Sequence, residues 1–204
     1  AALKALPADS DVYEVTSLAA ARKVTAAALT VLTEHGAAGF GAPVLVVDSL
    51  TQFSEWHQND VAEATSQRFL GDNQRENGWQ QFNSEFGRFI DDLVRIAQYI
   101  HVVVICHANM KADPGKGQWA GISLTPKMAE RVGRTSNWLL FMTARELSEA
   151  DAKEFGDDDP FIAVMESRNG KKRYTERILH TQPVEGGWHA AASTLHLKPE
   201  EVPN

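Results

Sequence analysis

The 204-residue sequence has a single cysteine, Cys106, and no apolar run longer than five residues. One thiol excludes a disulfide framework and a cysteine-based zinc site, and it fits a reducing compartment such as the cytoplasm. Five apolar residues are far too few to cross a membrane. The first ten residues lack the basic and apolar regions of a signal peptide. We therefore expect a cytoplasmic protein with no membrane association.

Charge is unevenly distributed along the chain, whose net charge is −7. Residues 146–159 hold seven acidic residues and one lysine, which account for nearly all of this excess. By contrast, residues 109–134 and 166–177 each hold five basic residues against two acidic ones. A polyanion can therefore bind locally to a chain that is acidic overall, although solvated loops are the alternative interpretation.

The pattern of apolar and turn residues predicts alternating strands and helices. Residues 51–78 form a polar segment without a clear period, residues 109–126 are expected to form a long loop that carries glycine and lysine, and the acidic residues 146–159 are expected to form a further loop. The expected helices are 17–35, capped by Ser17 and stopped by Gly36, then 79–99 and 127–133. The expected strands are 12–15, 44–47, 102–106, 138–144, 161–167, 173–180 and one of 188–191 or 194–197.

Two of these strands, VLVV at 44–47 and VVVIC at 102–106, are apolar throughout. That composition predicts parallel strands buried on both faces. Asn169-Gly170 between the strands at 161–167 and 173–180 predicts a hairpin with a tight turn. The order of elements predicts an α/β fold with a mainly parallel sheet flanked by helices and a C-terminal antiparallel hairpin extension.

Polar side chains follow both buried strands. Asp48 comes directly after VLVV, and ligands gather at the carboxyl ends of strands in α/β sheets. Its carboxylate is suited to hold Mg²⁺ through water; a helix cap is the alternative. His107 follows VVVIC and can respond to a phosphate or a polarised water. The alternative is a satisfied histidine at a strand end.

Several segments, read in order, resemble one family. VLVVDSLTQF resembles the Walker B strand of RecA-type recombinases, and VVVICHANMK through WLLFMTARE is similar to that family's DNA-binding loop region. SRNGKKRY at 167–174 is similar to the basic hairpins of RecA-like hexameric ATPases. The chain most closely resembles phage RecA-like ATPases that support single-strand annealing recombination, over residues 12–180.

This resemblance implies a single ATPase core over residues 1–204 that uses ATP and Mg²⁺ and binds single-stranded DNA. It also implies a homo-oligomeric ring or filament, with other phage recombination or replication proteins as further partners. Two rivals stay open: a helicase motor of the replicative type, and a binding module that kept the fold without hydrolysing nucleotide.

The resemblance also implies roles for particular residues. Asp48 would hold Mg²⁺ with Ser49 supporting its water shell, and His107 would report the nucleotide state. Arg168 and Lys171 would reach a neighbouring subunit's nucleotide, unless they belong to an ordinary solvated turn. The expected DNA-binding residues are Lys111, Lys116, Trp119, Lys127, Arg131 and Arg134, with a mobile surface loop as the alternative.

One departure from the family is large, because the Walker A loop G-x-x-x-x-G-K-[S/T] is absent. The GKG at 115–117 lacks the earlier glycine and the following hydroxyl residue. Backbone N–H groups of that loop cradle the phosphates in the family. The resemblance places the loop and the catalytic glutamate before residue 1, so we expect this chain alone to be inactive as an ATPase.

Overall fold

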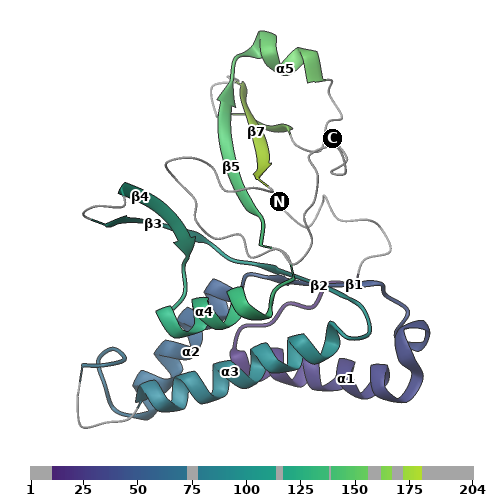
Figure 1. Cartoon of the computed structure of the whole chain (residues 1–204), viewed down its shortest axis with the longest axis vertical. Coiled ribbons are helices and arrows are strands. Elements are labelled where there is room, and N and C mark those ends of the chain that lie inside the picture. The colour runs from purple at the N-terminus through teal and green to yellow at the C-terminus, as the bar shows by residue number, and fades with distance from the viewer. Residues whose placement is uncertain are drawn as a thin grey trace. The chain divides into compact units, whose positions relative to one another are not determined.

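The structure, a computed structural model, describes residues 11–72, 78–113, 117–137, 139–155, 162–166 and 172–180. The chain divides into two compact units: residues 1–107 with 122–131, and residues 108–121 with 132–204. Helices and small sheets occur together, and one strand pair is parallel (Figure 1). The predicted α/β class is confirmed.

Three helices and two strands make up most of the first unit. They are α1 (Leu18–Phe40), β1 (Val44–Asp48), α2 (Leu50–Ala64), α3 (Gly78–Ile96) and β2 (His101–Ile105). Helix α4 (Pro126–Thr135) begins in this unit. The strand predicted at residues 12–15 is wrong, because these residues pair with no described strand and both Val12 and Tyr13 are exposed.

The start of α1 confirms the predicted cap, since the Ser17 side chain accepts a hydrogen bond from the Ala20 N–H at 3.1 Å. The predicted stop at Gly36 is an interruption rather than an end. Gly36 has φ 67°, and helical turns resume as far as Phe40. Gly41, in the left-handed conformation, then ends the helix by donating its N–H to the Ala37 carbonyl.

Helix α2 lies in a stretch for which the sequence predicts no element. The Ser49 hydroxyl caps it by accepting from the Gln52 N–H at 3.3 Å. Its buried face combines apolar residues with polar ones, which hides the helical period. The buried residues are Leu50, Thr51, Phe53, Ser54, His57, Val61 and Ala62.

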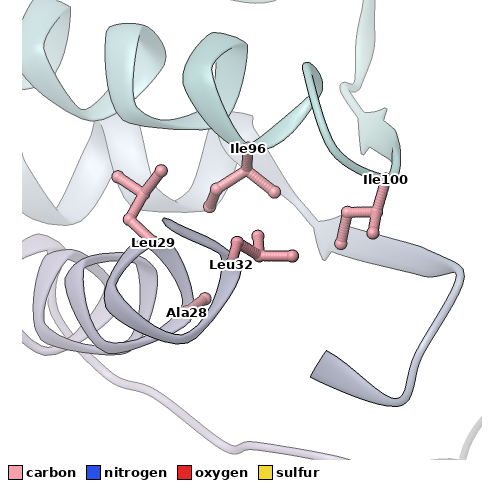
Figure 2. Packing of buried hydrophobic residues seen from close by; sticks show 5 residues of the cluster. All are labelled: Ala28, Leu29, Leu32, Ile96 and Ile100. Atoms are coloured by element: carbon pink, nitrogen blue, oxygen red, sulfur yellow. The ribbon is translucent and has the colours of Figure 1, made fainter. Parts of the chain in front are cut away.

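Helix α3 confirms the predicted helix and its apolar stripe. Phe82, Phe86 and Phe89 are almost completely buried, and the Phe89 ring meets Phe53 of α2 edge-on at 5.8 Å. A second cluster joins α1 to the C-terminal end of α3. Figure 2 shows Leu29 and Leu32 of α1 beside Ile96 and Ile100, with Ala28 completing the group. Burial of these side chains is the main stabilisation of the first unit.

Strands β1 and β2 pair in parallel, with Val44 opposite His101 and Asp48 opposite Ile105. Their predicted burial on both faces is wrong. One face is exposed at Val44, Val46, Val103 and Ile105, while alternate positions are more buried because successive side chains point to opposite faces. Apolar composition showed that these strands suit a buried sheet, but not which face the helices cover.

The second unit holds most of β4 (Gly117–Ile122) together with β3 (Ala108–Asp113), β5 (Phe141–Leu147), α5 (Glu149–Phe155), β6 (Ile162–Glu166) and β7 (Lys172–His180). Strands β3 and β4 pair with each other, so the loop predicted at 109–126 is in large part a two-stranded sheet. Helix α5 lies in the acidic segment, where no element is predicted. The strand predicted within 188–197 lies outside the described residues.

The predicted antiparallel extension is confirmed as a three-stranded sheet with the order β5-β7-β6. The Arg145 guanidinium of β5 donates to Glu176 of β7 at 2.9 Å, directly across the pair. Glu166 stands opposite Lys172. A two-residue turn at Asn169-Gly170 would instead place Glu166 opposite Arg173, so the observed register differs by one residue from the predicted one. Residues 167–171 themselves lie outside the described part of the chain.

No helix within the described residues is long and apolar enough to span a bilayer.

Adjacent positions of β1 provide a matched test of the one-sided burial. Val47 is 7% exposed and Val46 is 55% exposed. We expect Val47→Ala to lower the free energy of unfolding by about 1.5–3 kcal/mol and Val46→Ala by less than about 1 kcal/mol. Urea unfolding followed by circular dichroism measures both. Equal losses would show that the second face is also covered in solution.

Burial also affects the protonation of His57 on α2, which is 5% exposed and stacks on Phe82. Burial lowers the pKa of His57 from 6.5, and Arg22 lowers it further, while Glu85 and Asp60 raise it. The imidazole Nε2 lies 3.3 Å from Glu85 Oε2 without forming a hydrogen bond. The folded protein therefore binds this proton less readily than the unfolded chain does.

We expect stability to be fully present above pH 6.5 and to fall as pH drops below it, because the unfolded state then binds more protons. In the His57→Gln variant, the slope of the unfolding free energy against pH should be smaller than in the wild type by up to one proton. Unfolding free energies between pH 5 and 7.5 test this. An imidazole NMR titration of wild-type His57 with a midpoint above 6.5 would contradict it.

Candidate functional site

The carboxyl ends of β1 and β2 lie at one edge of the parallel pair, where Asp48 stands opposite Ile105. Asp48 is exposed, and its peptide bond to Ser49 is cis. Ser49 is buried, and its hydroxyl is the cap of α2. The helix cap considered as an alternative role for Asp48 therefore belongs to its neighbour. The Asp48 carboxylate has no ion-pair or hydrogen-bond partner within the described part of the chain.

His107 is fastened to the same edge through its backbone. Its N–H donates to Thr51 Oγ1 at 3.0 Å, and Thr51, in the first turn of α2, is only 2% exposed. The His107 carbonyl accepts from the Ser123 N–H at 2.8 Å. The chain leaves the first unit after His107 and returns to it from β4 just before Ser123. These two residues are hydrogen-bonded to each other. Asp48 ends β1 and His107 follows β2, so both lie at the carboxyl ends of the parallel pair, while the contacts of Thr51 and Ser123 were not predicted from the sequence.

The thiol next to His107 has no nucleophilic character at neutral pH. Burial raises the pKa of Cys106 to about 11, so the thiol stays protonated. No cluster of three metal-ligating side chains occurs among the described residues. A metal at this edge would therefore depend on Asp48 together with water or ligand oxygens.

The predicted DNA-binding residues fall on two elements. Lys111 lies in β3 and Trp119 in β4, while Lys116 lies outside the described residues. Lys127, Arg131 and Arg134 lie on α4 at spacings of four and three, which place them on one helix face. The hairpin residues Arg168 and Lys171 are also outside the described part of the chain.

Arg131 already has a structural partner in the first unit. Its Nη2 donates to both carboxylate oxygens of Asp91 on α3, at 2.6 Å for Oδ2. The guanidinium lies so close to α3 that a Cβ at Gly87 would come within 2.8 Å of Nη1. Glycine at this position permits the approach. The ion pair fixes Arg131 in place, and its contact with DNA stays a prediction.

A family model described as an AAA domain matches residues 9–186. The chain belongs to this AAA domain family. Membership makes the chain part of a nucleotide-dependent ATPase family, whose members use nucleotide and typically Mg²⁺. No curated protein and no solved structure matches the chain.

An AAA domain typically uses Mg²⁺ and a nucleoside triphosphate, and the strand edge at Asp48 fits the first of these groups. Mg²⁺ keeps several waters and is held by one or two carboxylates plus substrate phosphates, and the exposed Asp48 carboxylate suits that arrangement. Bound there, the ion would neutralise phosphate charge. For the triphosphate itself, the sequence holds no G-x-x-x-x-G-K-[S/T] loop. Of the two groups, the residues at this edge would therefore fit the hydrated metal, which Asp48 would hold.

Proposed function

We propose that this AAA domain chain is the core of an ATP-dependent, single-stranded-DNA-binding ATPase of phage-type recombination or annealing. It would work as a homo-oligomer in the cytoplasm alongside other phage recombination or replication proteins. The observation that carries the proposal is the backbone of His107, which is hydrogen-bonded to Thr51 and Ser123 at the strand edge that carries Asp48, one residue before β3 begins.

This connection gives a route from nucleotide to DNA. A metal-bound phosphate at Asp48 would lie beside His107, and β3 begins at the next residue. A shift of His107 would therefore reach the strands that carry Lys111 and Trp119. A lysine neutralises a backbone phosphate, and an aromatic ring stacks on an unpaired base of any sequence. Such binding suits a protein that anneals strands without sequence preference.

The proposed trans-acting role of Arg168 and Lys171 belongs to the oligomer. The strands β6 and β7 that flank them form an antiparallel pair, which is the framework that such a hairpin needs. In a ring or filament these cations would approach a neighbour's γ-phosphate and stabilise the charge of the transition state.

A non-hydrolysing binding module is the second candidate, because the 204 residues lack a phosphate-cradling motif. A helicase motor is distinguished by its activity. Strand displacement by the complete protein would favour the motor, and annealing without unwinding would favour the proposal.

Binding of a labelled single-stranded oligonucleotide, followed by fluorescence anisotropy, tests the DNA role. Trp119→Ala should weaken binding by about 1–3 kcal/mol with little change in its salt dependence. Lys111→Ala and Lys116→Ala should each weaken binding and make the salt slope shallower by about one unit.

Lys23→Ala is the matched control, since Lys23 is exposed on α1 and has the same charge. It should bind like the wild type. Unchanged binding by all three test variants, with their circular dichroism spectra intact, would remove the β3–β4 sheet from the DNA interface.

A further inference from the structure

A second polar site lies between α3 and α4, wholly within the first unit. It is a hollow of about 500 Å³. Among the described residues, two cations and three uncharged polar residues line it, and no acidic residue does. The lining residues are Gln80, Asn83 and Ser84 of α3 with Lys127 and Arg131 of α4.

The helices present these residues by their period. Gln80, Asn83 and Ser84 are three and four positions apart, so they share one face of α3, away from its buried phenylalanine stripe. Lys127 and Arg131 are four apart on α4. Hydroxyl, amide and cationic groups therefore meet across the hollow, and each of these side chains can donate hydrogen bonds to an anion.

The two cations differ in how they are held. Arg131 is anchored by Asp91, which offsets its charge, and Gly87 allows its guanidinium to lie against α3. Lys127 is exposed and has no ion-pair partner among the described residues. The hollow therefore keeps a net positive charge that Lys127 supplies, beside a guanidinium held in a fixed position.

Asn83, which lines the hollow, has a polar atom without a partner in the described part of the chain. Its Oδ1 is buried and has no hydrogen-bond partner among the described residues. An oxygen in that state calls for a donor, such as a water or a ligand hydroxyl. A phosphate group with its bound water suits both the cations and this oxygen, because its charged oxygens accept from the cations and a water held by the phosphate can donate to Oδ1.

We propose that the hollow between α3 and α4 binds a phosphate group, free or esterified, through Lys127, Arg131, Asn83, Ser84 and Gln80. The inference rests on the proposed function only for the source of that phosphate, which would be the backbone of the bound strand. Gln80, Asn83 and Ser84 would then extend the DNA-binding surface from α4 onto α3.

A titration of the full 204-residue chain with inorganic phosphate, followed by amide NMR, tests this site against chloride at equal ionic strength. We expect saturable shifts at Asn83 and Ser84. Lys127→Gln and the isosteric Asn83→Asp should each weaken phosphate binding about tenfold, as loss of a charge-assisted hydrogen bond does.

Matched controls make the same changes of charge at exposed positions on other helices. Lys23→Gln on α1 and Asn59→Asp on α2 should bind phosphate like the wild type. Absence of saturable shifts, or equal weakening by controls and test variants, would overturn the site.

A single-stranded oligonucleotide distinguishes the source. Displacement of inorganic phosphate by the oligonucleotide would support a strand backbone, and phosphate binding without displacement would support a free phosphate at the same site. Oligonucleotide binding that depends on Trp119 but not on Asn83 or Lys127, with no phosphate titration, would overturn the hollow and leave the proposed function standing.

Discussion

The two hydrogen bonds of the His107 backbone are the constraint on which the candidate chemistry depends. The N–H is held by Thr51 at the start of α2, and the carbonyl is held by Ser123, where the chain returns from β4. Since Asp48 immediately precedes Ser49, the cap of α2, one short region fixes the end of both parallel strands. The end of β1, the start of α2 and the backbone of His107 therefore belong to one hydrogen-bonded edge of the first unit.

The helices behind this edge supply its rigidity. The α3 stripe is buried against α1 and α2, and these contacts hold the covered face of β1 and β2. The other face shows a row of exposed branched residues. A parallel sheet normally has both faces covered. In the first unit the helices cover one face of β1 and β2, and the other face is an exposed apolar surface.

Sequence reasoning succeeded where one physical rule dominates. The α3 stripe follows the helical period, and Asp48 and His107 follow strands that end at the same edge because the two strands are parallel. Sequence reasoning failed where a contact joins residues far apart in the sequence, or where the buried face of an element combines polar and apolar residues. Thr51 and His107 are 56 positions apart, and a side-chain-to-backbone bond leaves no pattern. Helix α2 was hidden by its polar buried residues, and β3 and β4 by glycine and lysine that resemble a loop. Arg131 looked like a free basic residue because Asp91 lies on another helix.

The central claim is that Asp48 holds a divalent cation at the edge that it shares with His107. Mn²⁺ can replace Mg²⁺ as a paramagnetic probe and broadens the NMR signals of nearby amides. The account predicts that Asp48, Ser49 and His107 broaden together in the wild type and that Asp48→Asn abolishes this while signals in the acidic segment still broaden. Broadening at this edge that survives Asp48→Asn, or that reaches Asp48 but not His107, would contradict the claim.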